Sequence, residues 1–134
     1  MAHVLVLEPD VRLGKLYAEA LRARQHQVIA CTTAQAAVCE ADGQCPDIVL
    51  LELQLTGHSG IEFLYEFRSY TDWQHIPVIV LSHVPPAEFD QSSDLLRHRL
   101  GVRAYYYKPQ TNLLAIQRAV DAVLSAPQQD PAIL

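Results

Sequence analysis

The stretch Pro46–Leu55, with the sequence PDIVLLELQL, decides the fold of this 134-residue chain. Its apolar part, Ile48–Leu51, is continuous rather than alternating, and it lies between two charged residues, Asp47 and Glu52. A short run of this kind is typical of a β-strand that is buried on both faces. Such strands occur in parallel sheets that carry helices on each side, so the stretch predicts an α/β fold.

Four further apolar runs predict the other strands of the sheet: His3–Leu7, Gln27–Cys31, Val78–Leu81 and Val102–Tyr106. They alternate with amphipathic stretches in which apolar residues recur at helical spacing. Asp10 and Thr33 precede the first two of these stretches as candidate helix N-caps. Five βα repeats imply a parallel sheet with right-handed crossovers and helices on both faces.

The composition fits one soluble domain, because half of the residues are hydrophobic. A formal net charge of −5 argues against direct nucleic-acid binding, since such surfaces are usually basic. We find no apolar run near the roughly 20 residues of a membrane span and no signal peptide, so we expect a cytoplasmic protein. The cysteines, Cys31, Cys39 and Cys45, lack CxxC spacing and are expected to be reduced thiols, mostly in the core. We assign residues 1–124 to the domain and 125–134 to a tail or the start of a linker.

Polar residues collect at the predicted strand ends. Glu8 closes the first strand, Glu52 the third and Ser82 the fourth, and Lys108 follows the fifth. In an open parallel sheet the carboxyl ends of the strands share one edge, where ligands bind. The sequence therefore predicts that two carboxylates, a hydroxyl and an ammonium group converge in one crevice.

Four fragments that contain these residues, in this order, resemble the receiver domain of two-component response regulators: Val4–Asp10, Pro46–Gly60, Ile76–Ser82 and Gly101–Pro109. The resemblance covers nearly the whole chain and implies a flavodoxin-like (βα)5 fold with strand order 2-1-3-4-5. It places Glu52 at the phosphoacceptor position and Ser82 at the switch hydroxyl. It also makes Tyr105 the switch aromatic and Lys108 part of the Lys-Pro pair that follows the fifth strand.

Two departures from the family pattern lie in the expected phosphorylation site. The family has an aspartate where this chain has Glu52, and Pro9 stands where the family usually has the aspartate that binds magnesium. Mg²⁺ demands octahedral oxygen ligands, so losing one carboxylate should weaken its binding severely unless Asp10 substitutes. One added methylene also moves the acceptor carboxylate by about 1.5 Å. We therefore expect a pseudo-receiver that is not an enzyme and has no cofactor.

The function expected from this pattern is signal transduction by protein–protein contact, independent of phosphorylation. The alternative is a phosphorylatable receiver that accepts a phosphoryl group from a histidine kinase in a phosphorelay. A crevice reused for a nucleotide or flavin is disfavoured, because Pro9-Asp10-Val11 is not a Gly-rich loop. In the absence of a metal, we expect Lys108 to form an ion pair with Glu52, close to Glu8.

The expected partner is a protein: a sensor kinase, an output domain or another regulator. Receivers commonly bind partners through helix four, strand five and helix five, and a homodimer could use the same face. Four arginines fall in this region: Arg97, Arg99, Arg103 and Arg118. The segment between Ser82 and Gly101 is a few residues longer than is typical, either as a loop insertion or as an altered signalling face. His58 and His83 are expected to be ordinary loop residues near the crevice.

Overall fold

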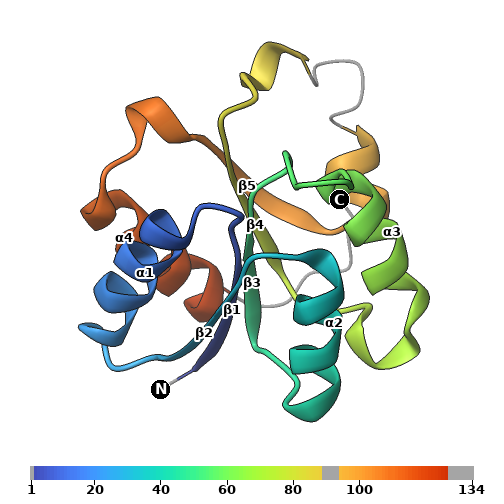
Figure 1. Cartoon of the computed structure of the whole chain (residues 1–134), viewed down its shortest axis with the longest axis horizontal. Helices are drawn as coiled ribbons and strands as arrows, with labels where there is room; N and C mark the ends of the chain where they lie inside the picture. Colours follow the sequence, from blue (N-terminus) through green and yellow to red (C-terminus); the bar gives the residue numbers. More distant parts are fainter. Residues whose placement is uncertain (1, 89–93, 127–134) are drawn as a thin grey trace.

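The computed structural model describes residues 2–88 and 94–126, in which one five-stranded sheet has the order β2-β1-β3-β4-β5 (Figure 1). Every neighbouring pair of strands is parallel. This confirms the predicted topology. The strands are β1 (His3–Leu7), β2 (Gln27–Cys31), β3 (Ile48–Leu51), β4 (Val78–Ser82) and β5 (Val102–Tyr107), so β4 and β5 each run one residue further than predicted.

Helices cover both faces of the sheet, α1 and α4 on one and α2 and α3 on the other (Figure 1). Their bounds are α1 Val11–Arg22, α2 Ala34–Gly43, α3 Gly60–Ser69 and α4 Leu113–Ser125. The side chains of Asp10 and Thr33 cap α1 and α2, as predicted, by accepting backbone N–H bonds. Ser59 and Asn112 cap α3 and α4 in the same way, and the sequence interpretation did not identify them.

The core has two halves, because successive side chains of a strand point to opposite faces. In β1, Val4 and Val6 pack with the α1 and α4 side, whereas Leu5 and Leu7 pack with the α2 and α3 side. All five residues of β1 and all four of β3 are buried. The strands have continuous apolar runs because helices cover both faces of the sheet. This packing on both faces holds the strand ends that carry Glu8 and Glu52 in place.

The predicted fourth helix is present as a short helix of a different type in the residues that the structure describes. Leu95–Arg99 form one π-helical turn, η3, which ends at Leu100 and is followed by Gly101 at a φ of 69°. Glycine adopts this left-handed conformation without steric cost, so the chain turns there into β5. The polar residues 90–93 of the predicted insertion lie outside the described part of the chain.

Three smaller expectations can be compared with the structure. Cys31 is buried, but Cys39 and Cys45 are exposed on and just after the short helix α2, so the expected core placement is wrong for two of the three thiols. Helix α4 extends to Ser125, and residues 127–134 of the predicted tail lie outside the described residues. Within the described ranges, 2–88 and 94–126, no helix is both long and apolar enough to cross a membrane.

Candidate signalling site at the carboxyl ends of the strands

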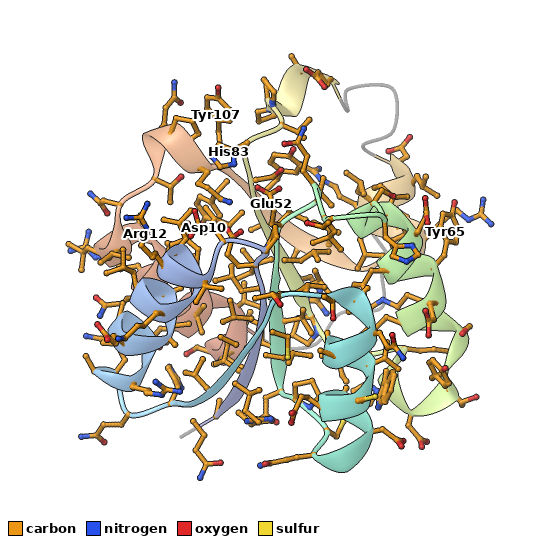
Figure 2. All side chains as sticks on the ribbon, viewed as in Figure 1. Asp10, Arg12, Glu52, Tyr65, His83 and Tyr107 are labelled. Carbon is orange, nitrogen blue, oxygen red and sulfur yellow. The ribbon has the colours of Figure 1, made fainter. Side chains whose placement is uncertain are left out.

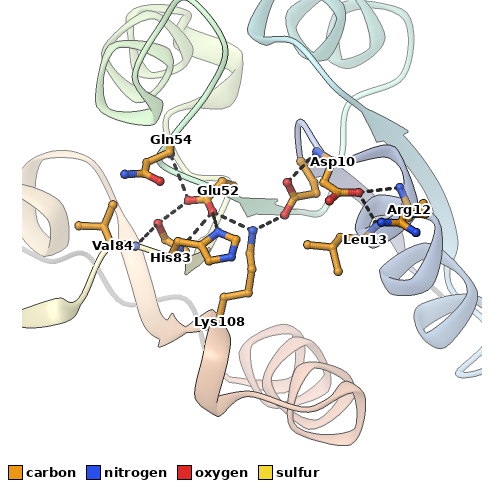
Figure 3. A network of polar contacts seen from close by, with 10 residues as sticks. Asp10, Arg12, Leu13, Glu52, Gln54, His83, Val84 and Lys108 are labelled. Atoms are coloured by element: carbon orange, nitrogen blue, oxygen red, sulfur yellow. Dashed lines mark hydrogen bonds and ion pairs between the residues drawn. The ribbon is translucent and has the colours of Figure 1, made fainter.

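Glu52 lies at the centre of a polar network at the carboxyl ends of the strands (Figure 3). Its side chain accepts hydrogen bonds from the Lys108 ammonium at 2.7 Å and from the Ser82 hydroxyl. Two backbone N–H groups, those of Gln54 and His83, donate to the same carboxylate at 3.1 Å each. Because only 2% of the Glu52 side chain is exposed, these donors replace most of the hydration that a carboxylate requires.

Lys108 contacts two buried carboxylates at once. Its ammonium nitrogen lies 2.7 Å from Glu52 Oε1 and 2.5 Å from Glu8 Oε1, and only 8% of the lysine side chain is exposed. The predicted ion pair with Glu52 is therefore confirmed, and the pair extends to Glu8. The backbone N–H of Asp10 donates to the other Glu8 oxygen at 3.0 Å. Both carboxylates thus have partners inside the protein.

These contacts set the charge state of Glu52. Burial by itself raises the pKa of its carboxyl, but hydrogen bonds from Lys108, Ser82 and the Gln54 backbone, together with the lysine charge, outweigh burial and hold the pKa below its usual value. Glu52 is therefore an ionised carboxylate at neutral pH.

The segment after β4 is tied to the same carboxylate. The ring nitrogen Nδ1 of His83 lies 3.2 Å from Glu52, although 55% of this side chain is exposed. The Ser82 hydroxyl also accepts the N–H of Val84, and Tyr105 donates its hydroxyl to the Val84 carbonyl at 2.6 Å. His83 is thus more than the ordinary loop residue that we expected. Ser82 and Tyr105 hold one short segment beside Glu52.

The side chains of Asp10 and His58 do not join the network. The Asp10 carboxylate accepts the N–H groups of Arg12 and Leu13 at 2.9 and 3.2 Å as the cap of α1 (Figures 2 and 3). His58 instead lies 3.4 Å from Glu62 on the exposed side of α3. Across residues 2–88 and 94–126, no group of three or more histidine, cysteine, aspartate or glutamate side chains could hold a metal ion.

The sequence interpretation gave Gly60 only as the start of the third helix and did not assign Tyr17 to the site. A Cβ atom on Gly60 would lie only 2.7 Å from Leu53 Cα, so glycine lets α3 begin against the loop that carries Glu52. Tyr17 of α1 is buried, and burial followed by the charges of Glu8 and Glu52 raises the pKa of its phenol. The only signal for Tyr17 was its place on the apolar stripe of a helix, which indicates packing rather than a site.

The four arginines of the predicted partner face are exposed. Arg97 and Arg99 belong to η3, Arg103 to β5 and Arg118 to α4. None of them forms an ion pair with another described residue.

Comparison with known proteins places these features in a family. The family model for the response regulator receiver domain matches residues 4–117. The KDP operon transcriptional regulatory protein KdpE of Escherichia coli is 31% identical over 109 residues, which are 81% of this chain and 45% of that protein. The polar-differentiation response regulator DivK of Brucella ovis is 26% identical over 123 residues, 91% of this chain and 93% of its own. The chain thus spans less than half the length of KdpE.

A solved structure supports the fold. The Vibrio cholerae chemotaxis protein CheY4, crystallised at low pH, superposes with a TM-score of 0.81 over 92% of this chain and 98% of its own, at 18% identity. At that identity the likeness shows the fold alone.

Proposed function

This chain belongs to the response regulator receiver domain family, and we propose that it signals through protein contacts in a state held by Glu52 itself rather than by a phosphorylated aspartate. The observation that carries this proposal is the set of donors on the Glu52 carboxylate: the Lys108 ammonium, the Ser82 hydroxyl and two backbone N–H groups.

These donors are the groups that a phosphoryl group at the end of β3 would need. A phosphoryl group brings three acceptor oxygens and nearly two negative charges, which require several donors and a cation in a buried site. Here the switch hydroxyl and the cation are already bonded to the Glu52 carboxylate. Phosphorylation would have to break these bonds before it formed new ones, so the site favours a permanent carboxylate over a transferable group.

The residues present do not fit a magnesium ion. Pro9 has no ligand side chain, and the Asp10 carboxylate is occupied as the cap of α1. The Lys108 ammonium contacts both Glu8 and Glu52 and so lies where a cation would balance their charge. Mg²⁺ requires near-octahedral oxygen ligands at about 2.0–2.1 Å, and two carboxylates that share one lysine do not supply them. We propose that the lysine replaces the metal and that the domain has no phosphotransfer activity of its own.

We propose a protein as the partner: a sensor kinase, an output domain or another regulator. The exposed arginines of η3, β5 and α4 would form the contact, and the same face would be used in a homodimer. The double variant Arg99→Glu/Arg103→Glu should then show weaker partner binding, or weaker dimerisation measured by sedimentation, with an unchanged far-UV circular dichroism spectrum. Unchanged association in that double variant would exclude this face.

Intact mass spectrometry tests the independence from phosphorylation. The protein and its Glu52→Gln variant are incubated with acetyl phosphate and Mg²⁺ under identical conditions. We expect no added phosphoryl group in either protein, and any modification elsewhere should appear in both. A phosphoryl group that appears in the natural sequence and disappears in Glu52→Gln would instead establish the alternative, a phosphorylatable receiver.

A further inference from the structure

Helix α3 connects the Glu52 site with the proposed partner face. The helix begins at Gly60, next to the loop that carries Glu52, and ends at Ser69. Its 10 residues span about 15 Å at a rise of 1.5 Å per residue. Hydrogen bonds fix both of its ends, the first to the Glu52 carboxylate and the second to the junction between η3 and β5.

The first end of α3 is tied to Glu52 through one short loop. The backbone N–H of Gln54 donates to Glu52 Oε2 at 3.1 Å, and Gln54 forms an antiparallel β-bridge with Ser59. The Ser59 hydroxyl caps α3 by accepting a backbone N–H of its first turn at 3.1 Å. The N–H of Gly60 also donates to the Leu53 carbonyl at 2.6 Å. The acceptor strength of the Glu52 carboxylate therefore affects the first turn of α3.

Arg68 ties the other end of α3 to the junction between η3 and β5. Its guanidinium donates to the carbonyls of Leu100 at 2.9 Å, Gly101 at 3.4 Å and Trp73 at 2.6 Å. A Cβ atom on Gly101 would lie 2.5 Å from this guanidinium, so Arg68 fills the space that the glycine leaves. One side chain thus joins the last turn of α3 to the end of η3, the start of β5 and the segment that follows α3.

The buried side of α3 is a stack of aromatic rings. The ring centroids of Phe63 and Phe67 lie 5.4 Å apart, and Phe67 stacks on Trp73 at 5.0 Å. All three residues are buried. Close-packed interiors have low compressibility and transmit strain. A displacement of the first turn of α3 should therefore also move Arg68.

The turn that Arg68 holds has an uncommon conformation. The N–H of Leu100 donates to the Leu95 carbonyl at 3.0 Å, which is the i→i+5 bond of a π-helix. Such turns are rare and occur frequently at functional sites. An α-helical turn, with i→i+4 bonds, would shift this hydrogen bond by one residue and would rotate Arg97 and Arg99 about the helix axis. The π turn thus has a close alternative that presents the partner face differently.

We propose that Arg68 is a positioning residue that couples the Glu52 carboxylate to the partner face through α3. The carboxylate holds the loop and the first turn of α3, and Arg68 holds the π turn at the far end of the same helix. This connection is separate from the segment that Ser82 and Tyr105 hold beside Glu52. Its role in signalling rests on the proposed function, whereas the coupling itself requires no partner.

Backbone amide hydrogen exchange of the whole chain at pH 7 measures this coupling. The Leu100 amide reports on the π turn, and the Val120 amide, within α4 on the other face of the sheet, is the reference. Glu52→Gln is the perturbation, because glutamine has one acceptor oxygen where the carboxylate has two. The effect of Glu52→Gln is compared in the natural sequence, in Arg68→Met and in Arg118→Met. Arg118 is exposed and forms no ion pair with a described residue, so it is the matched control.

We expect Glu52→Gln to raise the ratio of the Leu100 to the Val120 exchange rate about threefold in the natural sequence and in Arg118→Met. In Arg68→Met the same change should raise this ratio less than about 1.5-fold. If Arg68 were only structural, its loss would accelerate both amides, and the effect of Glu52→Gln on the ratio would persist. An unchanged ratio in the natural sequence, or an equal rise in Arg68→Met, would overturn the proposal.

Arg68→Lys keeps the test decisive if Arg68→Met does not fold or exchanges too fast. Lysine keeps the positive charge but offers one nitrogen in place of three, so the effect of Glu52→Gln on the ratio should fall at least by about half. An undiminished effect in Arg68→Lys would then overturn the proposal. Phosphorylation of Glu52, or unchanged association of Arg99→Glu/Arg103→Glu, would instead contradict the proposed function and leave the measured coupling in place.

Discussion

Replacing Lys108 by alanine is the sharpest test of the signalling site. The substitution leaves Glu8 and Glu52 buried, 3% and 2% exposed, without the cation that contacts both. Removing one partner of a buried ion pair costs about 3–5 kcal/mol, because the remaining charge stays desolvated. Serine and backbone donors still contact Glu52, so we expect a loss near 3 kcal/mol at pH 7.

The loss should depend on pH in a definite direction. In the natural protein the pKa of Glu52 is lowered, so its stabilising contribution is present above the unfolded pKa and is lost as the pH falls through the folded pKa. Without Lys108, burial dominates and the pKa of this carboxyl should rise above its usual value. Protonation of Glu52 near pH 5 should then restore part of the stability of Lys108→Ala, whereas the natural protein should gain no stability from it. The difference in stability between the two proteins should therefore shrink on acidification.

Urea unfolding followed by Trp73 fluorescence measures the free energy of unfolding at pH 7 and pH 5. Lys108→Met keeps most of the apolar stem and should lose nearly as much stability as Lys108→Ala if charge is the cause. Lys15→Ala, on the exposed side of α1, is the control for loss of a lysine. Equal destabilisation by Lys108→Ala at both pH values would refute the electrostatic reasoning.

Three further changes test neighbouring parts of the structure, each by urea unfolding. Gly60→Ala should cost about 1–3 kcal/mol, because its Cβ would meet the Leu53 backbone at 2.7 Å; Gly43→Ala, with open space around it, should be neutral or stabilising. Arg68→Met should cost at least about 2 kcal/mol, since it leaves three backbone carbonyls without their donor. Asp10→Ala should cost about 1 kcal/mol, whereas Asp10→Asn retains the cap and should cost little; similar losses in both would contradict the capping role.

The sequence predicted the sheet and the polar crevice for one reason. Strands that are covered on both faces appear as continuous apolar runs, as in Ile48–Leu51, and the residue after each run must lie at the same edge of a parallel sheet. Glu8, Glu52 and Lys108 could therefore be placed together without knowledge of any side-chain conformation. The extent of the network required the structure, because a lysine reaches two acids only at particular rotamers.

Other features depend on tertiary neighbours that sequence periodicity does not specify. The apolar residues near Leu95 fit an α-helix as well as a π-helix, and the structure is needed to distinguish the two. Arg68 reads as an exposed helix residue, yet its donors bind carbonyls about 30 residues away along the chain, at Leu100 and Gly101.

The departures at positions 9 and 52 are expected to act together, and this leads to a final prediction. Glu52→Asp shortens the acceptor and should free the Ser82 hydroxyl, but Pro9 still offers no ligand for a metal. Pro9→Asp adds a carboxylate, but Glu52 still occupies the donors. Acetyl phosphate with Mg²⁺ should therefore phosphorylate neither single variant, whereas Pro9→Asp/Glu52→Asp should gain one phosphoryl group by intact mass, since phosphoryl transfer requires both a positioned nucleophile and charge neutralisation by a metal. Phosphorylation of Glu52→Asp alone, at the rate of the double variant, would show that Lys108 suffices for the chemistry and that Pro9 is not a barrier.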